Sequence, residues 1–249
     1  MPCRNASVAG YRLADYRRGR HQAVARVLAA LDAGFLESSR CYFGGGTRMA
    51  LELDEYRESQ DLGFLCADLN GYRSMRAAIS EHSLGPILPT LSAGITLLRD
   101  VRADQYGIRT VLGVDGEPVK FEIILEARIA LAPGHAPGIP VICLDRTSCF
   151  AEKWLANADR WIDSAVLSRD AVDLAFMLSA WSAADADAGA LLAERAYGAA
   201  IRRAAVGACT KLIEDAAYRK RCAEGLAIED AKGLLLKLRK LARFAAQLK

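Results

Sequence analysis

The spacing of apolar residues divides the chain into a first part of mixed strands and helices and a second part of helices. Strand-length apolar runs predict strands at 41–43, 61–66, 95–101, 108–114, 119–125 and 141–143. Helical spacing between these runs predicts helices over 18–39, 47–53 and 71–82. Beyond residue 150 the spacing is helical throughout, which predicts helices over 151–161, 169–181, 186–206, 209–224 and 228–248.

A segment rich in proline and glycine lies between the two parts. Residues 132–140 read APGHAPGIP, which is typical of a connector. We therefore predict an α/β core over 1–132 and a helical domain over 141–249 that contributes to the same cleft. Asp115-Gly116 is a hairpin turn signal. The expected fold class is α/β (α+β), a mixed sheet with flanking helices followed by a C-terminal helical bundle.

Composition excludes membrane, disordered and disulfide-rich classes. Hydrophobic residues make up 52% of the chain, but no run is long enough to cross a bilayer and none follows the N-terminus as in a signal peptide. The seven cysteines include no C-x-x-C pair, so a reducing compartment is expected. These features predict a soluble, cytoplasmic protein with no membrane partner. Although the net charge is only +3, the C-terminal end is basic, and it either meets phosphates or forms a solvated helix face.

A glycine-rich turn follows the first predicted strand. Gly44, Gly45, Gly46 and Thr47 stand between that strand and the next helix. Glycines let the backbone turn sharply and approach a ligand, and free N–H groups at a helix start suit a triphosphate. A simple strand-to-helix turn is the alternative interpretation.

Two strand carboxylates are candidate metal ligands. Asp61 begins one predicted strand, and position 63, on the same face, is glycine where a second aspartate would complete an Asp-x-Asp pair. Glu122 lies in the strand 119–125, whose apolar residues alternate to the opposite face. A carboxylate there pairs, binds a cation or faces water. An ordinary edge-strand glutamate remains the alternative.

Charged residues also open two predicted helices. Glu152-Lys153 lies in the first, and Asp170 and Asp173 share one face of the second. The alternative for the aspartates is helix-start chemistry, with Ser168 or Arg169 near an N-cap, Asp170 in the first turn and an i,i+4 ion pair between Arg169 and Asp173.

In order, these motifs resemble the AbiEii/AbiGii toxin family of nucleotidyltransferases, whose core is similar to the DNA polymerase β superfamily. The motifs are the glycine–threonine turn, Arg57-x-Ser59-x-Asp61, the strand carboxylate, Ala-Glu-Lys and Arg-Asp-x-x-Asp-Leu. The resemblance implies a toxin of a bacterial toxin–antitoxin system, with an antitoxin partner and transfer of a nucleotide from a nucleoside triphosphate to RNA, such as tRNA, or to protein. It implies Mg²⁺ held by Asp61 and Glu122, and phosphate contacts by Lys153. The implied nucleotide-binding residues are Gly44, Gly45, Gly46, Thr47, Arg57, Ser59 and Lys153; the implied catalytic residues are Asp61, Glu122, Lys153, Asp170 and Asp173.

Gly63 leaves three functional interpretations open. The first is an active Mg²⁺-dependent nucleotidyltransferase. The second is a degenerate member that binds a nucleotide or a partner without turnover, because two-metal transfer normally uses the missing aspartate. The third is a helical interaction protein with an accessory α/β domain, which the basic C-terminal end favours.

Overall fold

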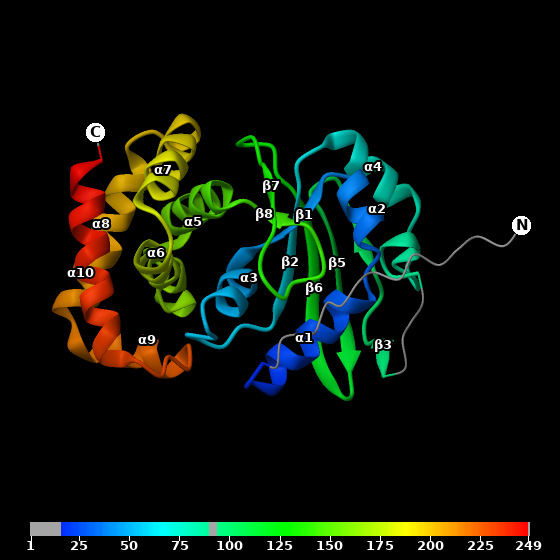
Figure 1. Cartoon of the computed structure of the whole chain (residues 1–249), viewed down its shortest axis with the longest axis horizontal. Coiled ribbons are helices and arrows are strands. Elements are labelled where there is room, and N and C mark those ends of the chain that lie inside the picture. The colour runs from blue at the N-terminus through cyan, green and yellow to red at the C-terminus, as the bar shows by residue number, and fades with distance from the viewer. Residues whose placement is uncertain (1–15, 90–93, 249) are drawn as a thin grey trace, which may run out of the picture.

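The computed structural model describes residues 16–89 and 94–248, and it places a sheet-containing half beside a half built of helices (Figure 1). The strands are β1 Cys41–Gly44, β2 Asp61–Cys66, β3 Ile95–Leu97, β4 Arg102–Ala103, β5 Gly107–Val114, β6 Glu117–Leu125, β7 Pro133–Gly134 and β8 Cys143–Leu144. The helices of the first half are α1 Gly19–Ala30, α2 Ala33–Ser38, α3 Gly45–Glu52 and α4 Leu69–Ala77, with a 3₁₀ turn at Gly85–Ile87. The second half contains α5 Arg146–Arg160, α6 Arg169–Ala180, α7 Ala183–Tyr197, α8 Ala200–Glu214, α9 Ala216–Gly225 and α10 Ala231–Gln247, with a 3₁₀ turn at Ser164–Val166. The predicted fold class is confirmed.

The sheet is mixed, with the strand order β3-β5-β6-β2-β1-β8-β7 and β4 paired to β5. β2 runs antiparallel to β1 and parallel to β6, so the two central strands with predicted carboxylates are neighbours. β5 and β6 form the predicted hairpin, and its turn residues Asp115 and Gly116 have φ of +49° and +90°. Positive φ at both positions is the type I′ geometry that suits Asp-Gly.

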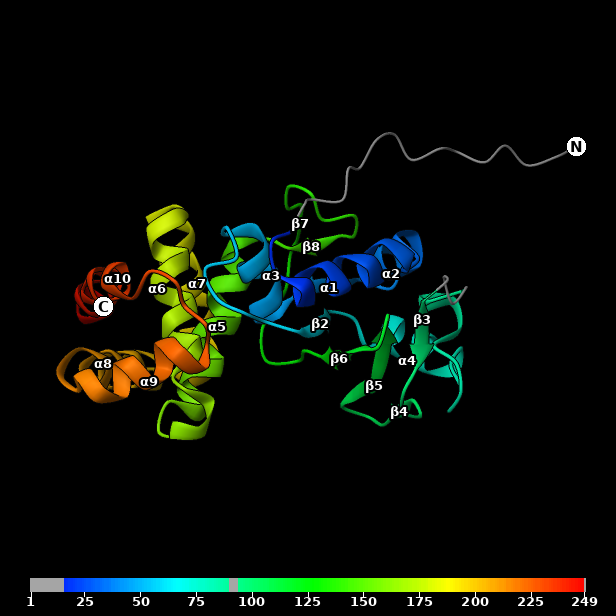
Figure 2. The same cartoon turned by 90° about the horizontal axis from the view of Figure 1, so that it is seen from below.

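The two faces of the sheet are covered differently. Alternate residues such as Phe64 and Phe121 face a core shared with α1, α2 and α4, whereas Tyr42 and Leu65 face a core shared with α5 and α6. Figure 2 shows α1 and α2 on one side of the sheet and the C-terminal helices gathered at one end. On the second face, Lys120 is exposed. The helices therefore cover only part of this face.

Several predicted elements are divided in the structure. The helix predicted over 18–39 is two helices, because Asp32 caps α2 by accepting a hydrogen bond from the backbone N–H of Phe35. The helix predicted over 186–206 ends at Gly198, which has φ of +56°, and the helix predicted over 209–224 is divided where Asp215 caps α9. The helices on either side of each break both bury an apolar face, so the apolar spacing in the sequence continues across the break and does not reveal it.

Other predicted boundaries also moved. Within the run predicted over 95–101, only Ile95–Leu97 forms a strand, β3, whereas β4 lies beyond the run at Arg102–Ala103; both strands pair with β5. α5 begins at Arg146 because Asp145 caps it. The predicted connector contributes β7 to the sheet edge. The domain boundary therefore stays a prediction. Among the helices of residues 16–89 and 94–248, none has the length and apolar character needed to cross a membrane.

Candidate active site

A cavity of about 340 Å³ lies where the partly covered face of the sheet meets α3 and α5. Gly44, Asp170 and Asp173 do not line it, although all three were predicted to be site residues. The structure brings the other predicted site residues together around this cavity: Gly45, Gly46, Thr47, Arg57, Ser59, Asp61, Glu122 and Lys153. Their catalytic and binding roles stay predictions.

Backbone conformation and close packing require glycine in the turn before α3. Gly45 has φ of +69°, a conformation that residues with a Cβ rarely adopt. A Cβ on Gly46 would lie 2.1 Å from Nη2 of Arg57, so glycine lets this arginine pack against the turn. The N-cap residue of α3 is Gly44, which has no side chain to cap the helix. Its first N–H groups are therefore available to an anion in the cavity.

Thr47 and Ser59 fix the start of β2 against α3. The Thr47 hydroxyl donates a 2.5 Å hydrogen bond to the backbone carbonyl of Asp61, and its oxygen lies 2.7 Å from Oγ of Ser59. Thr47 is buried, while Ser59 is partly exposed. These contacts set the position of Asp61 relative to the glycine turn.

Asp61 and Glu122 point to the same face from neighbouring strands. In the parallel register, Gly63 lies opposite Glu122 and Asp61 lies opposite Lys120. Oε1 of Glu122 accepts a 2.6 Å hydrogen bond from Nε of Arg109, and Oδ1 of Asp61 lies 3.8 Å from Nζ of Lys120. The side chains of Asp61 and Glu122 are 50% and 40% exposed. Both carboxylates are therefore accessible and each has one cationic partner.

A Cβ added to Gly63 would have no heavy atom within 4 Å. The space that a second aspartate would occupy is therefore open. Within the part of the chain that the structure describes, no cluster of three or more histidine, cysteine, aspartate or glutamate side chains could hold a metal ion. The candidate metal ligands are thus two carboxylates on the same sheet face as the open position at Gly63.

Asp173 is the centre of a buried ionic network. Nε and Nη2 of Arg57 donate hydrogen bonds of 2.6 and 2.9 Å to its two carboxylate oxygens. Nζ of Lys153 lies 2.6 Å from Oδ2, and the hydroxyl of Tyr56 donates to Oδ1 at 2.5 Å. Burial alone would raise the pKa of Asp173, but the charges of Arg57 and Lys153 hold that pKa below its usual value.

Asp170 completes this network one turn earlier on α6. It accepts a 2.9 Å hydrogen bond from Nζ of Lys153 and bonds of 2.6 and 2.9 Å from Nε and Nη2 of Arg160. Asp170 lies in the first turn of α6, as the alternative interpretation expected, but Asp173 pairs with Arg57 and Lys153, so the expected Arg169–Asp173 ion pair is wrong. Three cations, Arg57, Lys153 and Arg160, face two carboxylates, which leaves one excess positive charge beside the cavity.

The model of the family described as "Nucleotidyl transferase AbiEii toxin, Type IV TA system" matches residues 26–236. This range includes the glycine turn, both strand carboxylates and the buried network. The chain belongs to the AbiEii family. Membership of a Type IV toxin–antitoxin family implies an antitoxin partner. No match was found among curated proteins.

Two solved structures have a fold similar to that of this chain. JHP933 from Helicobacter pylori is 16% identical, with a TM-score of 0.52 over 92% of this chain and 91% of that one. A candidate nucleotidyltransferase from H. pylori is 15% identical, with a TM-score of 0.52 over 92% of this chain and 96% of that one. At these identities the likeness shows the fold alone.

The structure adds site residues that sequence reasoning missed in this AbiEii member. Arg160 lines the cavity seven residues after Lys153, which is two helical turns along the same face of α5. That spacing was a signal that could have identified it. Arg128 and Glu152 also line the cavity, and Nη2 of Arg128 lies 3.4 Å from Oε2 of Glu152. Burial and the nearby charge of Glu126 raise the pKa of Glu152 to about 8.

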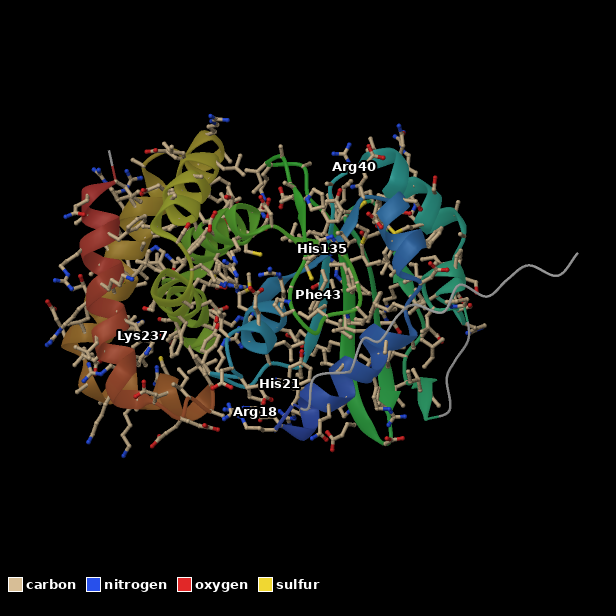
Figure 3. All side chains as sticks on the ribbon, viewed as in Figure 1. Arg18, His21, Arg40, Phe43, His135 and Lys237 are labelled. Carbon is tan, nitrogen blue, oxygen red and sulfur yellow. The ribbon has the colours of Figure 1, made fainter. Side chains whose placement is uncertain are left out.

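A buried histidine supports the loop that carries Arg57 and Ser59. Nδ1 of His21 lies 2.7 Å from Oε1 of Glu55, and Nε2 accepts a 3.1 Å hydrogen bond from the backbone N–H of Ser59. His21 is therefore neutral, with its proton on Nδ1. Burial lowers its pKa. Figure 3 shows His21 and Arg18 together at the N-terminal end of α1, where Arg18 also donates to the carbonyl of Ala227.

Proposed function

We propose that this AbiEii member is a Mg²⁺-dependent nucleotidyltransferase that transfers a nucleotide from a nucleoside triphosphate to RNA or protein. The observation that carries the proposal is a single cavity lined by a helix N-terminus, two accessible carboxylates and a lysine–arginine cluster. Nucleotidyl transfer needs groups of these three kinds, because the triphosphate is anionic and the attacking hydroxyl must be activated.

The residues present fit a hard cation at the sheet face. Asp61 and Glu122 supply carboxylate oxygens, which Mg²⁺ prefers, and the space beside Gly63 admits water or phosphate oxygens. When bound there, Mg²⁺ would lower the pKa of the attacking hydroxyl and neutralise phosphate charge. Arg109 and Lys120 are the cationic neighbours of these two carboxylates.

Other residues that line the cavity suit the triphosphate. The uncapped N-terminus of α3 offers backbone N–H groups, and Lys153 and Arg57 contribute positive charge. Asp173 holds both cations in fixed positions, so they need no reorganisation when phosphate enters. In this proposal Asp170 and Asp173 position the cations and do not touch substrate.

A second candidate function is nucleotide or partner binding without turnover. Gly63 favours it, because one of the expected metal ligands is missing and Glu122 lies opposite that gap in an ion pair with Arg109. Such a member would retain the cation cluster and the α3 terminus and hence bind phosphates.

Titration calorimetry with ATP, CTP, GTP and UTP, with and without Mg²⁺, tests both candidates. Radiolabelled nucleotides incubated with total tRNA then show whether label reaches RNA or the protein itself. Mg²⁺-dependent binding with transfer supports the enzyme, and binding without transfer supports the second candidate. If none of the four nucleotides binds, the transferase and the nucleotide-binding form of the second candidate are both wrong, and binding of a partner remains.

A further inference from the structure

A second hollow, of about 700 Å³, lies on the part of the sheet face that the helices leave uncovered. It adjoins the candidate active site, because Glu122 lines both. Four cationic side chains line it, and we call them the basic trough: Arg99, Arg102, Arg109 and Lys120. Its anionic lining consists of Asp100 and Glu122.

Strand register orders the basic trough toward the active site. Arg102 on β4 lies opposite Arg109 on β5, and Arg109 lies opposite Glu122 on β6. Glu122 in turn lies opposite Gly63, which lies opposite Gly44 at the start of the glycine turn. Partners in register share a face of the sheet. One row therefore runs from a cation at the sheet edge to the candidate metal ligands and the turn.

The outer end of this row carries unneutralised charge. Within residues 16–89 and 94–248, neither Arg99 nor Arg102 forms an ion pair with a carboxylate, and both are exposed. Arg102 also stands directly opposite Arg109, whose guanidinium group is paired with Glu122 at 2.6 Å and with Asp104 at 3.6 Å. Arg102 is therefore the cation of this row whose charge a bound anion would neutralise.

We propose that the basic trough binds backbone phosphates of a single-stranded RNA acceptor whose 3′ end lies at Glu122. This inference rests on the proposed transferase function and selects RNA over protein as the acceptor. Neighbouring strands are about 4.8 Å apart, so the backbone of Arg102 lies roughly 10 Å from that of Glu122. This is a short reach for phosphates that precede a terminal hydroxyl. Arginine favours phosphate because its planar fork forms paired hydrogen bonds.

The test compares the double variant Arg99→Gln/Arg102→Gln with the parent protein. The probe is a fluorescein-labelled single-stranded RNA of about ten nucleotides, within the usual site size of single-strand binders. Each lost phosphate contact lowers the salt slope by about 0.7, so two lower it by about 1.4 and weaken binding about 25-fold at 0.1 M salt. Affinity for the Mg²⁺–nucleotide complex should not change, because neither arginine lines the active-site cavity.

The matched control is Arg239→Gln/Arg243→Gln on α10, which removes the same charge from the exposed basic C-terminal end. The control should retain parental RNA affinity, and unchanged melting temperatures should show that both variants fold. The proposal is overturned if the parent does not bind RNA, if the trough variant binds like the parent, or if the control loses as much affinity.

A competition experiment separates RNA from an acidic protein partner. Unlabelled RNA should displace the probe far better than poly-glutamate of equal charge. Equal displacement by poly-glutamate would contradict an RNA-specific trough and favour an acidic protein. If the parent protein binds RNA through the basic trough but binds no nucleoside triphosphate, the transferase proposal is contradicted and RNA binding by the trough is not.

Discussion

The two carboxylate pairs of this protein look equivalent in the sequence and differ sharply in the structure. Asp61 and Glu122 are about half exposed on the sheet face, and each has one cationic neighbour. Asp170 and Asp173 are buried on α6 and are surrounded by Arg57, Lys153 and Arg160. The first pair is placed to exchange its partners for a ligand, and the second is not.

The difference follows from the free energy of burying charge. An exposed carboxylate can leave a weak ion pair at little cost, because water screens both charges. A buried carboxylate that lost its partners would leave cations uncompensated in a region of low dielectric. The buried pair therefore fixes the positions of Lys153 and Arg57, while the accessible pair is available to a metal ion.

The largest expected effect is on stability. Asp173→Asn would leave Arg57 and Lys153 without their shared charge, and breaking a buried pair in this way costs about 3–5 kcal/mol. Urea unfolding followed by circular dichroism measures the change. Asp61→Asn is the matched control, because its 3.8 Å contact with Lys120 is exposed and such pairs contribute about 0–1 kcal/mol. Similar losses for both variants would remove the distinction between the pairs.

The positions of the four carboxylates could be predicted in outline from the sequence, but most of their cationic partners could not. Alternation correctly placed Asp61 and Glu122 on one polar face, because a strand repeats every two residues. The pairing of Arg57 with Asp173 joins residues far apart in the chain, and no local pattern encodes it. Arg109, in contrast, was predictable. Counting outward from the Asp115-Gly116 turn places it opposite Glu122.

Helix ends were the other limit of sequence reasoning. The apolar spacing identified the helices of the second half, yet it ran through the breaks at Gly198 and Asp215. A cap acts through a hydrogen bond of one side chain and leaves the apolar period unchanged. Arg160, in contrast, was overlooked although the sequence could have identified it, because its spacing from Lys153 places both residues on one face of a helix.

Acid should weaken the loop that links the two pairs. The accessible Asp61 and the buried network's Arg57 both lie close to Ser59, whose N–H donates to neutral His21. Burial lowers the pKa of His21, so the unfolded chain binds this proton more readily and stability falls as pH drops below about 6.5. The groups facing His21 are Tyr16, Arg18, Glu55 and Glu58.

The check is the free energy of unfolding at pH 7.5 and at pH 5.5, measured for the parent and for His21→Gln. Glutamine can still accept the Ser59 hydrogen bond but does not titrate, so its stability should change less with pH. Equal slopes for the two proteins would show that His21 does not control this loop.

A smaller effect is expected from Gly63→Asp. The new carboxylate would enter open space on the face of Asp61, opposite Glu122, where Mg²⁺ gains an oxygen ligand. Repulsion among three carboxylates should leave the melting temperature equal or lower without Mg²⁺, and the rise on adding Mg²⁺ should exceed that of the parent. An identical Mg²⁺ response in parent and variant would mean that position 63 is not at a metal site.

The central claim is that Asp61 and Glu122, and not the buried pair, make nucleotide binding depend on Mg²⁺. Titration calorimetry of a nucleoside triphosphate with the parent, Asp61→Asn and Glu122→Gln tests it directly, with the exposed Glu117→Gln of the same strand β6 as control. The parent and the control should bind more tightly with Mg²⁺, and each active-site variant should lose at least about tenfold of that gain. Full Mg²⁺ dependence retained in both Asp61→Asn and Glu122→Gln would contradict the account.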